Sequence, residues 1–203
     1  SKNIGMYASS GKVENSGEIS ITAGTDNTGA VLNGASSSGK NTGKISVSGT
    51  GSSGIIVTDG ASFENTNELT ISGADSYGLI AKGGTVKGGT VNIDVTGTGS
   101  VGAYAGGSSS ASNVEITGGN VNLSGGGINF NSGQNGTLNL KDTKFITGKE
   151  SLGFYATGNG IINIQNLEGT IKGGTDSTER GTAFYVIGSG VGSTNITTSA
   201  DIE

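Results

Sequence analysis

Short apolar triplets recur along the chain, and a glycine or an alanine precedes each of them. These small residues stand 24, 25, 24, 24, 25, 26 and 30 positions apart. A disordered low-complexity chain has no reason to keep such a register, so the spacing indicates a repeated structural unit. The eight triplets are Met6-Tyr7-Ala8, Ala30-Val31-Leu32, Ile55-Ile56-Val57, Leu79-Ile80-Ala81, Ala103-Tyr104-Ala105, Ile128-Asn129-Phe130, Phe154-Tyr155-Ala156 and Phe184-Tyr185-Val186.

A second motif follows each of the early triplets and alternates polar residues with branched apolar ones. It reads Glu18–Ile21, Lys44–Val47, Glu68–Ile71 and Asn92–Val95, and it blurs in the later copies. Period-two alternation is typical of a half-buried strand. A weaker apolar position lies between the two motifs, so we predict three short strands per copy. No window shows an apolar face at helical spacing, and the abundant glycine disfavours helices.

A single copy cannot bury its own few apolar side chains, but stacked copies would form one continuous apolar column. Corresponding strands would then pair in parallel, about 4.8 Å apart. The sequence therefore predicts an all-β fold, a right-handed parallel β-helix (solenoid) of about eight coils with roughly 24–26 residues each, in which residues 1–203 form a single segment. The chain contains no proline, which agrees with strands that all donate their amides to a neighbour.

Asparagine occupies the same predicted corner in the first three copies, and Gly or Asn stands two positions later. Both residue types tolerate the left-handed backbone of a tight corner, and we expect that conformation here. In stacked coils the three asparagines would also share amide hydrogen bonds as a structural turn ladder. The ladder residues are Asn15, Asn41 and Asn65, followed by Gly17, Gly43 and Asn67.

Alternation also assigns the faces of the first strand in each copy. The first and third triplet positions are apolar and are predicted to point inward, so the middle position points outward. This outer column is Tyr7, Val31, Ile56, Ile80, Tyr104, Asn129, Tyr155 and Tyr185.

The outer column holds four of the five tyrosines of the chain. Tyrosine supplies contact area and a hydrogen bond at low entropic cost, which favours a binding surface. The alternative is that stacked aromatic and β-branched residues only stabilise a solvated sheet. The candidate binding stripe consists of Tyr7, Ile56, Ile80, Tyr104, Tyr155 and Tyr185.

Composition excludes several classes of function. The chain has no Cys and no His, which removes disulfides, zinc–thiolate sites and Ser-His-Asp or Cys-His catalysis. The net charge is −5 and no run of Lys or Arg occurs, which argues against a nucleic acid or an anionic membrane as partner. No apolar stretch approaches the ~20 residues that span a bilayer. We predict no metal and no cofactor, since the tandem Gly-Gly-x-Gly-x-Asp pattern of calcium-loaded β-rolls is absent.

An enzyme remains the alternative, because paired carboxylates hydrolyse glycosidic bonds without histidine. The acidic residues are scattered along the repeats rather than gathered in one or two of them. The longest insertion beyond the repeat lies around Asp176 to Arg180, and it is short for a loop that builds a catalytic cleft. We therefore predict a non-enzymatic protein, with a polysaccharide lyase or glycosidase as the second hypothesis.

The repeats resemble the passenger repeats of type V autotransporters, and more narrowly the large fusobacterial outer-membrane adhesins of the RadD type. The resemblance rests on Lys12–Gly17, on Ser16-Gly17-Glu18-Ile19-Ser20-Ile21 and on the Gly-Met/Leu/Phe-Tyr/Ile-Ala triplets, and it covers essentially the whole chain. It implies a long, exposed β-helix on the bacterial cell surface that adheres to host cells or to other bacteria.

The same resemblance implies that the chain, which begins at Ser1, is a fragment of a longer passenger. The expected partners are a host-cell surface protein or glycan, or partner bacteria, with the membrane reached only through a barrel absent from this chain. We expect a monomer. The sequence leaves open which receptor is bound and whether copies stack end to end through exposed coil edges.

Overall fold

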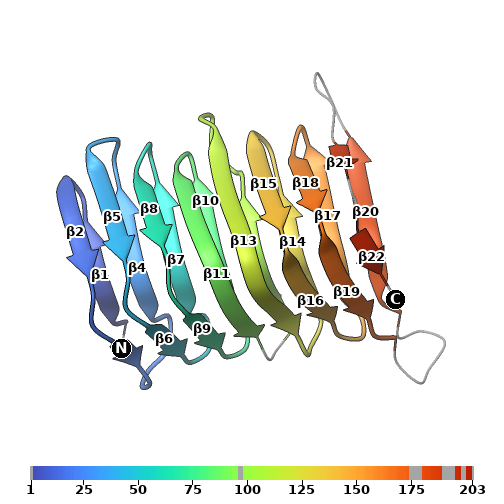
Figure 1. Cartoon of the computed structure of the whole chain (residues 1–203), viewed down its shortest axis with the longest axis horizontal. Coiled ribbons are helices and arrows are strands. Elements are labelled where there is room, and N and C mark those ends of the chain that lie inside the picture. The colour runs from blue at the N-terminus through green and yellow to red at the C-terminus, as the bar shows by residue number, and fades with distance from the viewer. Residues whose placement is uncertain (1, 96–97, 174–179, 189–194, 198–199, 203) are drawn as a thin grey trace.

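The computed structural model describes residues 2–95, 98–173 and 180–188, together with the backbone of residues 195–197 and 200–202. In these parts the chain consists of strands and turns and has no helix, so no helix that could cross a membrane is present there. The strands stack along the long axis of a rod, and the two chain ends lie at its opposite ends (Figure 1).

One strand from each of the eight copies forms a parallel sheet along the rod. Neighbouring strands come from consecutive copies, so that Met6 lies opposite Ala30 and Ala30 opposite Ile55. In order along the sheet, the strands are β1 (Ile4–Ala8), β4 (Thr28–Asn33), β7 (Ser53–Thr58), β10 (Tyr77–Lys82), β12 (Ser100–Ala105), β14 (Gly127–Ser132), β17 (Leu152–Gly158) and β20 (Thr182–Gly188).

The other strands form a second parallel sheet and a short third one. The main path of the second sheet is β2 (Gly11–Asn15), β5 (Ser37–Asn41), β8 (Ser62–Asn65), β11 (Thr85–Val95), β13 (Ser112–Leu123), β15 (Gly136–Lys141), β18 (Ile161–Gln165) and β21 (Asn195–Thr197). Three strands branch from it in succession after β13, namely β16 (Thr143–Thr147), β19 (Leu167–Ile171) and β22 (Ala200–Ile202). The third sheet contains β3 (Ile19–Ile21), β6 (Ile45–Ser48) and β9 (Leu69–Ser72).

This topology is a parallel β-helix of about seven turns, and it confirms the fold predicted from the repeat. Every strand pair in the described part of the chain is parallel, with partners one copy apart. The first sheet has one strand from each of the eight copies of the triplet, and the chain makes one turn of the solenoid between each strand and the next, which gives seven turns.

The fourth and fifth coils differ from the expected three short strands. There the second and third strands are continuous, as β11 and β13, and the register between them shifts around Gly89. Glycines replace the asparagine corner, and Gly119 adopts a φ of 91°. A side chain at this position would place its Cβ 1.9 Å from the Val91 carbonyl oxygen, so only glycine lets the backbones approach. The chain therefore bends here without leaving the sheet.

The asparagine corner itself does not use the left-handed backbone, and that expectation was wrong. None of Asn15, Asn41, Asn65, Gly17 and Gly43 has a positive φ. The left-handed positions lie in other turns, and the non-glycine residues among them are Asp26, Asp59, Asp75, Asn135, Asp142, Glu150 and Asn166. Gly43 is needed for a different reason, because a Cβ there would lie 1.8 Å from the Gly17 carbonyl oxygen in the coil below.

The core is a thin apolar column that runs the length of the rod. The inward triplet positions of the middle copies, such as Ile55, Leu79 and Ala103, are fully buried. Toward the C-terminal end the column becomes aromatic. Phe154 stacks on Phe130 and on Phe184, with ring centroids 5.1 and 4.9 Å apart, and Phe145 meets it edge-on at 5.0 Å.

A second buried column is polar, and the sequence did not reveal it. The backbone N–H of Asn27 donates to Ser52 Oγ at 3.3 Å, that of Ser52 to Ser76 Oγ at 3.2 Å, and that of Ser76 to Ser100 Oγ at 3.2 Å. All four side chains are fully buried. Each serine thus satisfies a backbone donor of the preceding coil, which is the requirement for a buried corner.

Candidate functional site

The outward face of the eight-stranded sheet carries two parallel columns of side chains. The first is the predicted middle column of the triplets. The second lies three residues earlier in each strand, because a glycine such as Gly78 turns inward between them and meets Ile93. The register of the second column is Ile4, Thr28, Ser53, Tyr77, Val101, Ile128, Leu152 and Thr182.

The residues of the predicted stripe share one column but differ in exposure. Tyr7 and Tyr185, on the first and last strands, have exposed fractions of 59% and 48%. Ile56, Tyr104 and Tyr155 are half-buried. The Tyr155 and Tyr185 rings stack with centroids 5.6 Å apart.

Ile80 differs from the other stripe residues because it is only 7% exposed. Its side chain belongs to the outward face, but neighbouring side chains cover it. It therefore contributes to the floor of the face rather than to a freely accessible stripe.

The sixth triplet was assigned to the wrong register. Phe130 lies opposite Ala103, and Asn131 rather than Asn129 lies opposite Tyr104. Asn129 is fully buried, and its Nδ2 donates to the carbonyl oxygens of Val121 at 2.8 Å and Ile146 at 3.1 Å. Ile128, which the triplet pattern predicted to point inward, belongs to the second outward column.

The two columns enclose a depression of about 420 Å³ at the middle of the face. Ile80 and Val101, 7% and 6% exposed, form its apolar floor. Two half-buried tyrosines, Tyr77 and Tyr104, also line it. The remaining lining residues are Gly51, Ser53, Lys82 and Asn131. An apolar floor between aromatic rings with a few polar groups is the composition of a recognition site.

Sequence reasoning missed Tyr77 as a member of this site. It stands two residues before its triplet, and simple alternation would have placed it inward with Leu79. The signal that could have found it is the small residue that recurs at this position in most copies of the repeat, because an inward-turned Gly78 interrupts the alternation.

Tyr104 is held in place by glycine-rich turns. Its hydroxyl lies close to Gly107 and Gly133, 2.7 and 3.3 Å from the Cβ positions that side chains there would occupy. Burial, followed by the neighbouring Tyr77, raises the pKa of the Tyr104 phenol above its ordinary value. The phenol is therefore protonated at physiological pH and is available as a hydrogen-bond donor.

Asn131 adds an unsatisfied polar atom to the same place. It lies between Tyr104 and Tyr155 in the column, and its Oδ1 is buried without a hydrogen-bond partner. A buried acceptor without a donor costs about 1–3 kcal/mol, so Asn131 is held in this position against that cost.

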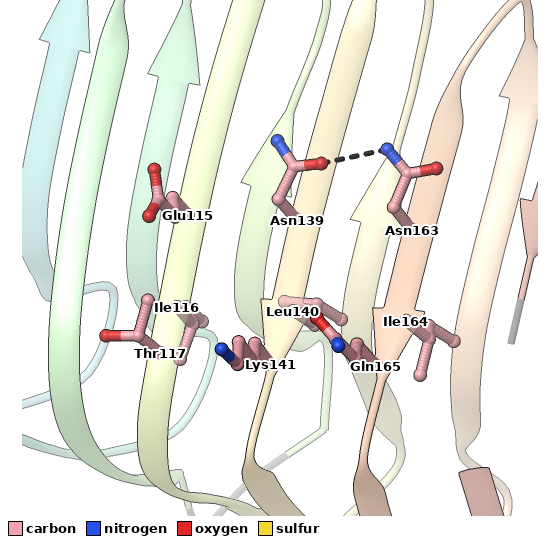
Figure 2. A pocket seen from close by; sticks show the side chains of 9 residues that line it. All are labelled: Glu115, Ile116, Thr117, Asn139, Leu140, Lys141, Asn163, Ile164 and Gln165. Carbon is pink, nitrogen blue, oxygen red and sulfur yellow. Dashed lines mark hydrogen bonds between the residues drawn. The ribbon is translucent and has the colours of Figure 1, made fainter. Parts of the chain in front are cut away.

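A second groove, of about 390 Å³, crosses the outer face of β13, β15 and β18. Figure 2 shows its two rows of polar side chains, with Asn139 and Asn163 in one row after Glu115. Asn163 Nδ2 donates to Asn139 Oδ1 at 2.8 Å. Glu115 is the single carboxylate among the residues that line this groove.

Glu115 also ends a column of alternating charge that the register reveals. In order along the second sheet, the column consists of Glu14, Lys40, Glu64, Lys87 and Glu115. Lys40 Nζ lies 3.4 Å from Glu64 Oε1. Opposite charges on adjacent strands stabilise the pairing of the coils.

Glu14, the first residue of this column, forms a close ion pair with Lys12. Lys12 Nζ lies 2.6 Å from Glu14 Oε1. This hydrogen bond, with the charges of Lys12 and Lys40, holds the pKa of Glu14 below its ordinary value. Among the described residues no group of three or more acidic side chains could hold a metal ion.

The predicted turn residues Asn15, Asn41 and Asn65 form a continuous ladder of amides. Asn15 Nδ2 donates to Asn41 Oδ1 at 2.7 Å, and Asn41 Nδ2 donates to Asn65 Oδ1 at 2.7 Å. Each asparagine also donates to the carbonyl two residues later, as Asn41 does to Gly43 at 2.5 Å. Asn65 ends the ladder by donating to the Gly88 carbonyl at 3.2 Å.

Comparison of the chain with protein-family models, with curated proteins and with solved structures finds no match. The function is therefore argued from the fold and from the chemistry of its faces.

Proposed function

We propose that this chain is a non-enzymatic segment of a bacterial cell-surface adhesin of the autotransporter type. It serves as a rigid β-helical stalk and contacts host-cell or bacterial partners through the outward face of the eight-stranded sheet. The observation that supports the contact most directly is the depression lined by Tyr77 and Tyr104, with its apolar floor of Ile80 and Val101.

The stalk is supported by the way the coils hold one another. Each described coil pairs with its neighbours along two or three strands, and the apolar column, the serine column and the amide ladder all run across coil boundaries. Interactions that repeat along one axis make the rod resist bending, and a rod of this kind holds a contact face away from the surface that carries it.

The contact face is supported by its composition. Tyrosine at a partly desolvated position combines a large ring with a hydrogen-bonding hydroxyl, which is the residue type that dominates binding energy at protein interfaces. The Tyr104 phenol and the Lys82 side chain add polar groups around the apolar floor.

The enzyme hypothesis receives less support. Hydrolysis by two carboxylates needs a pair across one groove, with the pKa of the acid raised. No carboxylate lines the tyrosine depression, and Glu115 alone lines the groove in Figure 2. Glu14, which does lie near a second acid, Glu64, has a lowered pKa, the opposite of what a general acid requires.

The proposal is tested by attachment of the fluorescently labelled chain to host epithelial cells and to partner bacteria. A variant with Tyr77→Ser and Tyr104→Ser removes both rings of the depression. A matched control carries Asn139→Ser and Gln165→Ser in the groove of the second sheet. We expect the tyrosine variant to lose attachment and the control to keep it, with both chains folded by circular dichroism. Absence of attachment by the folded wild-type chain, or equal attachment by the tyrosine variant, would contradict the proposal.

A further inference from the structure

The tyrosine depression on the outward face of the eight-stranded sheet has the dimensions of a small-ligand site. Its lining residues come from β7, β10, β12 and β14 and from the turn before β7, so it extends over three strand spacings, roughly 14 Å along the rod. Its volume of about 420 Å³ lies within the range of small-molecule pockets. On these four described strands no large apolar side chain is exposed, so the face lacks the broad apolar patch at the centre of a protein interface. The depression therefore fits a compact ligand better than a flat protein surface.

The register places the two tyrosines diagonally across the apolar floor. Tyr77 lies opposite Val101 on the neighbouring strand, and Tyr104 lies opposite Ile80. Both rings are half-buried. The face of an aromatic ring carries partial negative charge and attracts weakly positive C–H groups. A sugar ring is a compact ligand that presents such C–H groups on one side and hydroxyl groups at its edge.

Of the described residues that line the depression, Lys82 is the single charged one. It follows Ile80 by two residues on β10, so it lies on the same outward side, and it is exposed. Lys40 and Lys144 on other strands lie 3.4 and 2.7 Å from a glutamate oxygen, but Lys82 has no ion-pair partner among the described residues. Its ammonium group is therefore available to an anion, and it disfavours a cationic ligand between the rings.

The Tyr104 hydroxyl is a second polar group available to a ligand. It forms no hydrogen bond with a described residue, and the nearby Gly107 and Gly133 have no side chain that could bond to it. The protonated phenol donates a hydrogen bond to any acceptor that enters the depression. Among the described lining residues no carboxylate competes for these donors.

We propose that the tyrosine depression binds a carboxylate-bearing sugar of a surface glycan. The sugar ring packs between Tyr77 and Tyr104 over the apolar floor, and its carboxylate pairs with Lys82. This inference rests on the proposed function, because it keeps the same contact site and names the chemical class of the partner.

The direct test measures binding of matched sugars to the whole chain by saturation-transfer NMR. Methyl β-glucuronide and methyl β-glucoside share one ring and differ in a carboxylate against a hydroxymethyl group. The methyl glycoside of N-acetylneuraminic acid is a second carboxylate-bearing sugar and shows which of the two acids fits. We expect an acidic sugar to bind and the glucoside to bind about tenfold more weakly, because the glucoside makes no charge-assisted hydrogen bond.

Two lysine variants locate the bound carboxylate. Lys82→Met removes the ammonium group of the depression, and Lys87→Met makes the same change at an exposed lysine on β11 of the second sheet. We expect Lys82→Met to weaken binding of the acidic sugar about tenfold and to leave binding of the glucoside unchanged. The Lys87→Met control is expected to bind both sugars as the wild type does. Circular dichroism verifies that both variants are folded.

Three results would overturn the proposal. One is that neither acidic sugar binds, or that the glucoside binds as tightly as they do. Another is an equal effect of the two lysine variants, which would indicate a general effect of surface charge. The third is attachment to cells that survives periodate oxidation of their sugars but is lost after protease treatment, which would assign a protein partner.

These failures are distinguishable from a failure of the proposed function, which is measured by attachment alone. If the variant with Tyr77→Ser and Tyr104→Ser loses attachment and neither acidic sugar binds, the contact site stands and the sugar is wrong. If an acidic sugar binds through Lys82 and the folded wild-type chain attaches to no cell, the sugar site stands and the proposed function is wrong.

Discussion

Replacement of Asn41 by alanine is expected to lower the free energy of unfolding by about 3–4 kcal/mol. Asn41 is fully buried at the centre of the amide ladder. Its Nδ2 donates to the Gly43 carbonyl at 2.5 Å and to Asn65 Oδ1 at 2.7 Å, and its Oδ1 accepts from Asn15 at 2.7 Å.

The magnitude follows from the groups that the substitution leaves without a partner. Gly43 and Asn65 are buried, so two buried acceptors lose their donor, at about 1–3 kcal/mol each. Asn15 is half-buried on the first coil, and water can replace the acceptor that it loses. Two acceptors near the middle of that range account for the expected loss.

The assay is urea denaturation followed by far-UV circular dichroism, which gives the free energy of unfolding and its dependence on urea. The matched control is Asn15→Ala, which makes the same chemical change in the same column at the end of the rod. It leaves one buried acceptor, Asn41 Oδ1, without its donor, so it is expected to cost about 1–3 kcal/mol, less than Asn41→Ala, which leaves two. Equal losses in the two variants, or a loss below about 1 kcal/mol for Asn41→Ala, would refute the view that the ladder matters because it is buried.

Three further perturbations test other parts of the structure. Phe154→Ala removes a fully buried ring from the aromatic column and is expected to lower the free energy of unfolding, measured by urea denaturation, by about 3–5 kcal/mol. A decrease as small as that of an exposed substitution would contradict the stacked arrangement. Gly119→Ala is expected to prevent folding, because its Cβ would clash with the Val91 carbonyl oxygen. Gly11→Ala is the control, since Gly11 also has a positive φ, of 102°, but nothing lies near its Cβ position, and it should cost about 1–2 kcal/mol. Similar stabilities of the two variants would contradict the steric argument. The fold raises the pKa of the Tyr104 phenol, so the protonated phenol contributes fully to stability below about pH 10, and this contribution is lost as the pH rises through the folded-state pKa. Tyr104→Phe should therefore abolish this alkaline part of the pH dependence of the free energy of unfolding. An unchanged pH profile in that variant would assign the alkaline loss to other groups.

The candidate site could be predicted only in part. The column that contains Tyr7, Tyr104 and Tyr155 follows from alternation within one strand, which is a local property of the chain. The exposure of its members does not, because the burial of Ile80 depends on side chains that other coils contribute. Tyr77 was missed for a related reason, since an inward glycine interrupts the alternation and turns two residues three positions apart to the same face.

The register of the sixth copy shows where a sequence pattern ceases to be sufficient. Asn129 occupies the middle of an apolar triplet, and polarity alone places it outside. In the structure it is fully buried, and a side-chain hydrogen bond to Thr147, 2.8 Å from its Oδ1, helps to satisfy it. A buried amide is tolerated when its donors and acceptors are all paired, and the partners lie 8 to 18 residues away in the chain.

The sequence by itself determined the period, the all-β class, the parallel stacking and the inward columns of most coils. These properties follow from the spacing of apolar and small residues, because a strand has a fixed alternation and a repeat too small to fold alone must stack. The tertiary structure alone decided which outward residues are accessible, where Asn corners give way to continuous strands, and how polar atoms at the corners are satisfied. Those outcomes depend on contacts between residues about one coil apart, whose partners are set only once the register between coils exists.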